Sequence, residues 1–191
     1  MLEDLKGKVC AANKELVKQG LVISTIGNVS GRDSRKEYVV IKPEGVSYEE
    51  MTPADMVVTD LNGEVVEGLH QPSGYIHAHC FVYKHRKDVG GIAHTHSPYA
   101  TSYAVQGKPI PALLIPQVAN FGGDIPVTQK YDMKQKYGIG SALVKAMKNN
   151  NEKAVILNRH GVFTFGNDSA EAVKYAALVE DLAKTYRAAG K

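Results

Sequence analysis

The chain has 191 residues, of which 43% are hydrophobic and 23% are charged, close to an ordinary globular protein. Lys and Arg number 23 against 20 Asp and Glu, which gives a formal net charge of +3 at pH 7. These values exclude intrinsic disorder and low-complexity scaffolds. No basic block interleaved with aromatic residues occurs, so we expect no nucleic-acid partner.

The sequence gives no sign of a membrane segment or a disulfide framework. No apolar run approaches the roughly 20 residues of a membrane-spanning helix, and the charged start MLEDLKGKVC lacks the apolar stretch of a signal peptide. Two cysteines, Cys10 and Cys80, are too few for a disulfide-rich fold. We therefore expect two reduced thiols in a cytoplasmic protein that does not bind membranes.

The first part of the chain predicts one helix followed by strands. Apolar residues recur at helical spacing over 2–16, and Gly20 is a suitable stop. A β-branched run then leads into the Gly- and Asn-rich turn GNVSGRD, and residues 37–41 form a second strand. Residues 55–68 contain two apolar runs around Asn62-Gly63, the pattern of a β-hairpin.

The rest of the chain predicts a mixed order of elements. They are a helix over 73–87, a strand over 90–96, a short helix over 98–105, a proline-punctuated extended segment over 110–115, a helix near 139–148, strands over 154–157 and 162–165, and a last helix over 173–188. Asp168 or Ser169 caps that last helix. The hairpins and irregular order argue against a parallel doubly wound sheet, so we expect a single α/β domain over residues 1–191.

Three histidines have the spacing of a metal site. His94 and His96 are two apart on a predicted strand, so both side chains point to the same face. His160 lies in the turn Asn158-Arg-His-Gly between two late strands. Two ligands from one strand and one from a distant turn match the ligand count of an open catalytic zinc site. The alternative is a hydrogen-bonded pair of imidazoles at a strand end.

Two segments are suited to a small anion. The loop GNVSGR (27–32) offers backbone N–H groups and short polar side chains, although a simple tight loop is the alternative. Ser73 and Gly74 open a predicted helix, so their N–H groups could face an anion, with an ordinary helix cap as the alternative. His77 and His79 point to different faces of that helix. We expect His79 to be packed and hydrogen-bonded rather than to bind a metal.

The motifs GNVSGRD, VVIKPEGVSYEEMTPADMVVTDLNGEVVEG, HTHSPYAT and NRHGVF, in this order, resemble the class II aldolase/adducin family over nearly the whole chain. The resemblance implies a three-layer α/β/α fold with a mainly antiparallel central sheet. It also implies a homotetramer with active sites between subunits, and a divalent metal, usually zinc, on His94, His96 and His160. The N-terminal third is most similar to the L-ribulose-5-phosphate 4-epimerases, with the L-fuculose-phosphate aldolases as relatives of the same fold.

The resemblance further implies a phosphate site. In the family, the GNVSGR loop, a KPSG-type turn and serines before the HTH strand hold the substrate phosphate. This role falls to six residues: Asn28, Ser30, Lys42, Gly45, Ser73 and Gly74. The turn reads Lys42-Pro43-Glu44-Gly45 here, so a carboxylate stands where a phosphate-binding hydroxyl is expected. If Glu44 points into the site, charge repulsion favours an unphosphorylated substrate.

The proton-transfer residues depart from the family pattern. Family members usually have Ser-Ser and then an acid at the helix start, but this chain has Ser73-Gly74-Tyr75. Tyr75 therefore replaces the acid and is the candidate catalytic residue. A tyrosine has an unperturbed pKa near 10, so it is a poor base at neutral pH, although its hydroxyl can donate. The epimerase's second acid has no counterpart in QVANFGG (117–123), and its C-terminal tyrosine has none either.

These features predict a zinc-dependent enzyme that breaks a C–C bond of a small phosphorylated ketose by retro-aldol chemistry, similar to L-ribulose-5-phosphate 4-epimerase. An L-fuculose-phosphate-type aldolase and a sugar-phosphate dehydratase are alternatives with the same metal requirement. A metal-binding family member without catalysis is a further alternative. The missing acid favours it, and the three retained histidines oppose it.

Overall fold

The computed structural model describes residues 2–147 and 151–190, and its centre is one antiparallel sheet. The sheet has seven strands in the order β4–β3–β2–β1–β5–β7–β6, and each neighbouring pair runs antiparallel. The strands are β1 (Asn28–Arg32), β2 (Tyr38–Ile41), β3 (Val57–Asp60), β4 (Val65–Glu67), β5 (Gly91–Thr95), β6 (Ala154–Leu157) and β7 (Gly161–Gly166). The prediction of a mainly antiparallel sheet is confirmed.

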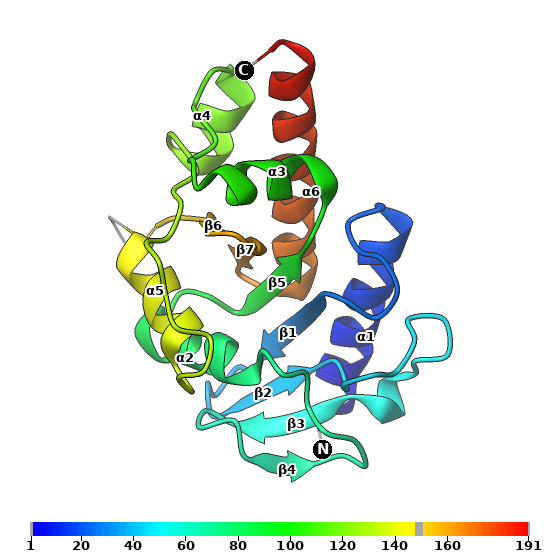
Figure 1. The fold of residues 1–191 in the computed structure, drawn as a ribbon. Coiled ribbons are helices and arrows are strands. Elements are labelled where there is room, and N and C mark those ends of the chain that lie inside the picture. The colour runs from blue at the N-terminus through cyan, green and yellow to red at the C-terminus, as the bar shows by residue number, and fades with distance from the viewer. Residues whose placement is uncertain (1, 148–150, 191) are drawn as a thin grey trace.

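Helices cover both faces of this sheet. They are α1 (Glu3–Lys18), α2 (Ile76–His85), α3 (Pro98–Gln106), α4 (Ile115–Phe121), α5 (Gly138–Ala146) and α6 (Ser169–Ala188), with a short 3-10 helix η1 (Pro53–Asp55). Helices α1 and α6 pack on one face, and α2 and α5 pack on the other (Figure 1). The three-layer α/β/α architecture is thereby confirmed. No helix in the described ranges combines the length and apolar character needed to cross a membrane.

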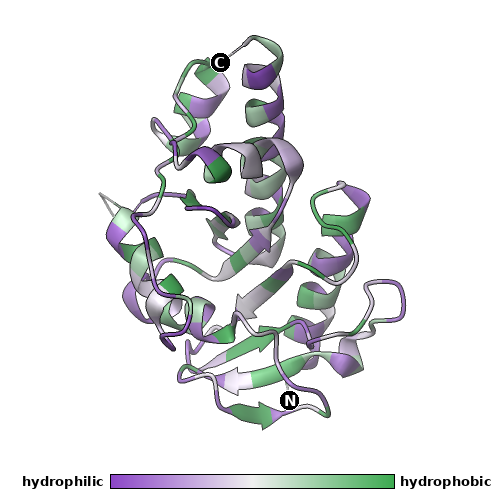
Figure 2. Ribbon diagram, viewed as in Figure 1, coloured by the Kyte–Doolittle hydropathy of each residue, from purple (hydrophilic) through white to green (hydrophobic). Residues whose placement is uncertain are grey.

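Apolar side chains of the central strands point alternately to the two faces of the sheet, so each face has its own hydrophobic core. Val29, Val40 and Ala93 lie in the core beneath α1 and α6, whereas Ile41 and Ile92 lie in the core beneath α2 and α5. Successive side chains of a strand point to opposite faces, so these apolar strands bury both sides. In Figure 2 the strands β2 and β3 accordingly carry the green of hydrophobic residues. In the pairing of β1 with β5, Asn28 lies opposite His94 and Ser30 lies opposite Ile92. His94 is two residues from Ile92 on the same strand, so it also belongs to the α2–α5 face.

Several predicted boundaries are confirmed by local chemistry. The Asp168 side chain accepts a hydrogen bond from the Glu171 N–H at 2.8 Å and caps α6 as predicted. Helix α1 ends two residues before Gly20, whose φ of +66° reverses the chain. Asn62-Gly63 forms the turn between β3 and β4, with a φ of +86° at Gly63.

Several elements differ from the prediction. The prediction of GNVSGRD as a turn that follows a strand is wrong, because its residues Asn28–Arg32 form the buried strand β1 paired with β2 and β5. Helix α2 begins at Ile76 and not at Ser73, because the Ser73 N–H donates to the Lys42 carbonyl at 3.0 Å and holds the preceding turn against residues 42–44. Helix α4 was not predicted, since Gln117 is its one buried residue and Ile115 is 85% exposed, so no apolar periodicity marks it. Helix α5 runs from Gly138 to Ala146, and the predicted end at residue 148 lies outside the described residues.

Candidate metal centre

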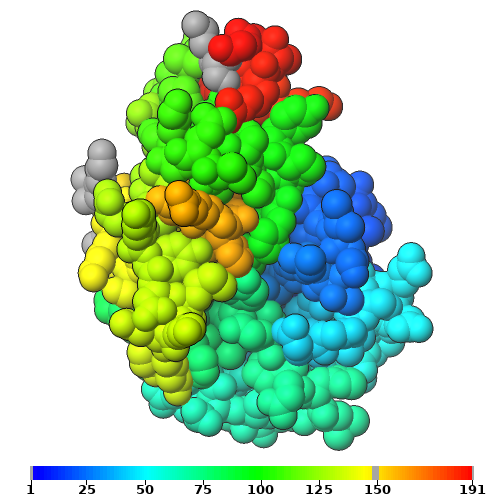
Figure 3. Space-filling model, in the orientation of Figure 1, coloured from blue at the N-terminus to red at the C-terminus, as the bar shows by residue number. Residues whose placement is uncertain are grey.

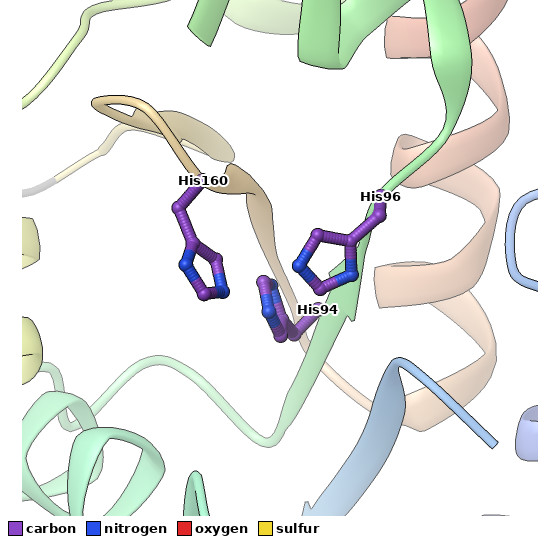
Figure 4. A group of neighbouring side chains, drawn as sticks. All are labelled: His94, His96 and His160. Atoms are coloured by element: carbon purple, nitrogen blue, oxygen red, sulfur yellow. The ribbon is translucent and has the colours of Figure 1, made fainter. Parts of the chain in front are cut away.

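The three candidate ligands come from two neighbouring strands of the sheet. His94 lies in β5, His96 follows directly after that strand, and His160 lies in the turn between β6 and β7. In Figure 4 the three rings point toward one another from these positions. In Figure 3 the orange turn between β6 and β7 reaches the surface beside the yellow-green segment that precedes α5. The group is therefore anchored in the sheet but lies next to an open face of the molecule.

The distances fit a single metal ion. One ligand nitrogen from each histidine can be chosen so that all three lie within 4.8 Å of one another. His94 donates from Nδ1 to the Val162 carbonyl at 2.9 Å, which leaves Nε2 with its lone pair free. This buried Nε2, like Nδ1 of His96, has no hydrogen-bond partner among the described residues. Two imidazoles with buried, unused nitrogens and a third imidazole beside them are a donor set that suits zinc or a similar divalent ion.

The electrostatics keep these imidazoles neutral. Burial lowers the pKa of His96 to about 4, and the neighbouring His160 adds to that effect. Burial and then the charge of His96 lower the pKa of His94 well below its ordinary value. Burial lowers the pKa of His160 as well. Neutral imidazoles hold the lone pairs that a metal needs, so the group is ready to bind one at neutral pH.

A glycine makes the convergence of the two strands possible. A Cβ at Gly161 would lie 2.4 Å from the Thr95 carbonyl oxygen and 3.1 Å from Cδ2 of His96. The turn before β7 can therefore approach β5 this closely only if residue 161 lacks a side chain. Arg159, in the same turn, adopts a φ of +58°. This tight turn carries His160 back over the end of β5.

Two aromatic residues near the group were not found from the sequence. Phe163 of β7 stacks on His94 with ring centroids 4.1 Å apart and planes at 15°, and it fixes the orientation of that imidazole. The strand position of Phe163 opposite His94 would have been the signal for this contact. Tyr131 packs in the same core as Tyr75, and burial raises its pKa to about 12. Tyr131 lies in an irregular segment, so no periodicity could have indicated it.

Tyr75 is aimed at the histidine group. Its hydroxyl shares a hydrogen bond of 2.8 Å with Nε2 of His160, and its ring centroid lies 4.6 Å from that of His94. Burial raises the pKa of Tyr75, and the nearby negative charge of Glu44 raises it further. The phenol is therefore protonated at neutral pH while no cation is next to it. It sits where a proton can be given to a group bound at the histidines.

The predicted phosphate residues divide into two groups. Asn28 lies directly across from His94 on β1, is 1% exposed, and has no hydrogen-bond partner for its Oδ1 in the described ranges. Ser30, in contrast, bonds to Nδ1 of His79 at 2.7 Å and to the Tyr83 hydroxyl at 2.8 Å inside the core. The prediction that His79 is packed and hydrogen-bonded is confirmed, and the hydroxyl of Ser30 is occupied by this buried network.

The other predicted residues meet at the turn before α2. Ser73 is 5% exposed, and the Gly74 N–H donates to Oε2 of Glu44 at 2.9 Å. Lys42 is 2% exposed and donates from Nζ to the Pro43 carbonyl at 3.1 Å. Gly45 has a φ of +73°, so it turns the chain directly after Glu44. Glu44 thus enters the set of residues beside Tyr75.

Comparisons with known proteins agree with this architecture. The model of the family described as Class II Aldolase and Adducin N-terminal domain matches residues 7–187. An L-fuculose 1-phosphate aldolase of 34% identity superposes with a TM-score of 0.79 over 96% of this chain and 87% of that chain. The L-fuculose 1-phosphate aldolase from Glaciozyma antarctica PI12 has 25% identity and a TM-score of 0.81, over 99% and 75% of the two chains. YgbL from Klebsiella pneumoniae has 25% identity and a TM-score of 0.86, over 100% and 92%.

Proposed function

Because this chain belongs to the class II aldolase and adducin family, we propose that it is a metal-dependent lyase that cleaves a C–C bond of a small ketose. The observation that carries this proposal is the convergence of His94, His96 and His160, which bring one ligand nitrogen each to within 4.8 Å of one another. A divalent ion bound there, with zinc the expected one, supplies a Lewis acid that polarises the ketose carbonyl and stabilises the negative charge that develops during cleavage.

The chain's own residues supply orientation and proton transfer. The Val162 carbonyl fixes the tautomer of His94, and Phe163 fixes the plane of its ring. The amide of Asn28, buried beside His94, orients the substrate through hydrogen bonds to its hydroxyl groups. Tyr75 transfers a proton at its hydroxyl oxygen. Because its pKa is raised, the Tyr75 hydroxyl stays protonated at neutral pH. It holds a proton to give but is a weak acid and cannot act as the base, so we expect slow turnover of the usual sugar phosphates.

Among the reactions of this family we prefer aldol cleavage. The most similar of the three relatives described above, at 34% identity, is named as an L-fuculose 1-phosphate aldolase. YgbL of Klebsiella pneumoniae is described with three alternative activities, namely aldolase, epimerase and decarboxylase. The epimerase reaction predicted from the N-terminal third remains the second candidate, since it begins with the same bond cleavage.

A substrate screen tests this proposal. Purified protein loaded with zinc is incubated with pentuloses and hexuloses and their 1- and 5-phosphate esters, and the products are identified by mass spectrometry and NMR. Release of an aldehyde and a three-carbon ketone, dihydroxyacetone or its phosphate, supports the aldolase, and an epimeric ketose supports the epimerase. Absence of any product with zinc, together with unchanged behaviour after removal of the metal, would reject both reactions in favour of a binding role.

We also propose that the protein is a homotetramer. Exposed apolar side chains gather on α4 and the segment before it, where Leu113 is 53%, Ile115 is 85% and Val118 is 50% exposed. Such a cluster costs free energy in water, and association of subunits would bury it. Light scattering of the wild-type protein and of Ile115→Lys tests this idea. We expect a tetramer for the former and smaller species for the latter, whereas a monomeric wild-type protein would contradict it.

A further inference from the structure

We infer that the carboxylate of Glu44 takes the place of a substrate phosphate, so that this site accepts a ketose with a free hydroxyl terminus. The inference rests on the proposed function, because it concerns the substrate of the same site. It makes Glu44 a specificity-determining residue of this chain. Four observations support it. They are the position of the Glu44 backbone, the hydrogen bond already made by the Gly74 N–H group, the charge of the neighbouring side chains, and the acceptor atoms that are open to a ligand.

The backbone fixes Glu44 beside the start of α2. Pro43 and Pro72 form an isolated antiparallel bridge. On either side of it, the Glu44 N–H donates to the Gln71 carbonyl at 2.9 Å, and the Ser73 N–H donates to the Lys42 carbonyl at 3.0 Å. These hydrogen bonds hold two segments of the chain, about thirty residues apart in sequence, side by side. The side chain of Glu44 is therefore directed at Gly74 by the fold.

The Gly74 N–H is already bound to an anion. It donates to Oε2 of Glu44 at 2.9 Å, the distance of a well-formed hydrogen bond to a carboxylate. Backbone N–H groups in the turn before a helix are the groups that bind a phosphate. A phosphate here would have to displace Glu44 or lie beside its negative charge, which is strongly unfavourable at such short range. The protein's own carboxylate therefore fills this position.

The local charge leads to the same conclusion. Lys42 is buried, lies with Nζ 4.9 Å from the ring centre of Tyr48, and donates to the Pro43 carbonyl. Burial lowers the pKa of Lys42, and the charge of Glu44 opposes this shift. One cation is thus balanced by one anion at this end of the site. A balanced site has no excess positive charge to offer a phosphate dianion, but it suits a neutral polyol end.

The polar atoms open to a ligand here are acceptors. The buried Oδ1 of Asn28 has no hydrogen-bond partner in residues 2–147 and 151–190, and Oε1 of the exposed Glu44 is accessible to hydroxyl donors. Hydroxyl groups of a sugar donate hydrogen bonds to such oxygens. A phosphate dianion offers acceptors only, so it can donate a hydrogen bond to neither oxygen. A ketose that ends in a free CH₂OH group satisfies them.

Kinetics on matched substrates test the inference. The kcat/KM of zinc-loaded protein is measured for each ketose of the panel and for its phosphate ester, with Glu44→Ser and Glu44→Gln as variants. We expect the wild-type protein to prefer the free ketose by about tenfold or more, and Glu44→Ser to reverse this preference. Glu44→Gln keeps the shape of the side chain and removes its charge. Its ratio of kcat/KM for the free ketose to kcat/KM for the ester should therefore lie between the ratios of the wild-type protein and Glu44→Ser. Glu49→Ser, which removes an exposed acid of the same segment, leaves the wild-type ratio unchanged.

Calorimetry with glycerol phosphate, an unreactive phosphate monoester, gives a second readout that needs no turnover. We expect millimolar glycerol phosphate to bind to Glu44→Ser but not to the wild-type protein or to Glu49→Ser. Equal binding to the wild-type protein and to Glu44→Ser would overturn the inference, as would a wild-type preference for esters that Glu44→Ser does not change. If no ketose or ester reacts with any of these proteins, the proposed function fails, while the calorimetric comparison still decides the role of Glu44.

Discussion

The proposed site has two halves that are built on different kinds of backbone. The metal half consists of His94, His96 and His160, and strand pairing between β5 and β7 sets their positions. The substrate half consists of Lys42, Glu44, Gly74 and Tyr75, which lie in turns held together by the single bridge between Pro43 and Pro72. The two halves meet at the hydrogen bond between Tyr75 and His160.

This contrast indicates whether a single substitution in each half changes the type of reaction or the choice of substrate. Moving a ligand of the metal half requires a shift of paired strands, and a one-residue slip of β5 would turn His94 to the opposite face of the sheet. The substrate half depends on single side chains that are held by few contacts. We expect Glu44→Ser to leave the backbone bridge between Pro43 and Pro72 in place and to alter the charge that meets the substrate. We therefore expect the type of reaction to depend on the metal half and the choice of substrate on the substrate half.

The largest effect is expected from removal of a ligand in the metal half. His94→Ala should abolish stoichiometric zinc binding and lower kcat/KM by about 10³-fold, because the charge that develops in the reaction loses its main stabilisation. Metal analysis and kinetics measure both effects. The control is His85→Ala, an exposed histidine that bonds only to the Phe81 carbonyl of its own helix among the described residues. Retention of zinc by His94→Ala would show that the histidines do not form the metal site.

A smaller loss is expected in the substrate half. Tyr75→Phe keeps the ring but removes the hydroxyl that bonds to His160, so kcat should fall by about 10²-fold while the zinc content stays the same. Tyr75→Glu should raise turnover, since a carboxylate accepts a proton at neutral pH and this phenol does not. A wild-type rate of about 1 per second or more that falls in Tyr75→Glu would show that the tyrosine is the better proton-transfer group here.

Close packing within the metal half can be tested through stability. Gly161→Ala would force a Cβ to within 2.4 Å of the Thr95 carbonyl oxygen, so we expect the free energy of unfolding to fall by about 2 kcal/mol and zinc affinity to fall with it. Gly7→Ala is the matched control, because no atom lies within 4 Å of its new Cβ and the change in the middle of α1 should stabilise the protein by about 0.5–1 kcal/mol. Urea denaturation of both variants measures the difference.

The smallest effect concerns the buried support behind the metal half. His79 is fully buried, and burial lowers its pKa to about 3. Between about pH 6.5 and about pH 3, the unfolded chain binds a proton at His79 and the folded chain does not. The free energy of unfolding therefore decreases as the pH falls through this range. His79→Gln should remove roughly 1 kcal/mol per pH unit from the slope of the unfolding free energy against pH. Identical slopes for metal-free wild-type and variant proteins would contradict this expectation.

In the metal half, the pair His94 and His96 could be predicted from local spacing. The approach of His160 to this pair depends on a turn, and like the arrangement of the substrate half it could not be predicted that way. Two histidines two residues apart on a strand must share a face, so His94 and His96 were predictable from local geometry. The contact between Glu44 and Gly74 depends on a bridge between distant turns that have no periodic pattern. Helix α4 was missed for a related reason, since its apolar residues face outward and give no buried stripe. Local spacing thus predicts what lies on regular elements, whereas tertiary contacts place the turns.

With the proposed metal bound, the now unused Nε2 of His94 would link metal supply to the amount of folded protein. A buried acceptor without a partner costs the folded state about 1–3 kcal/mol, and a bound ion removes this cost. A metal that binds only the folded chain adds about 2.7 kcal/mol when its free concentration is 100 times the Kd. Chains that are made during zinc starvation would then unfold more often and be degraded sooner. The abundance of this protein, and not only its catalytic rate, should therefore follow the zinc available to the cell.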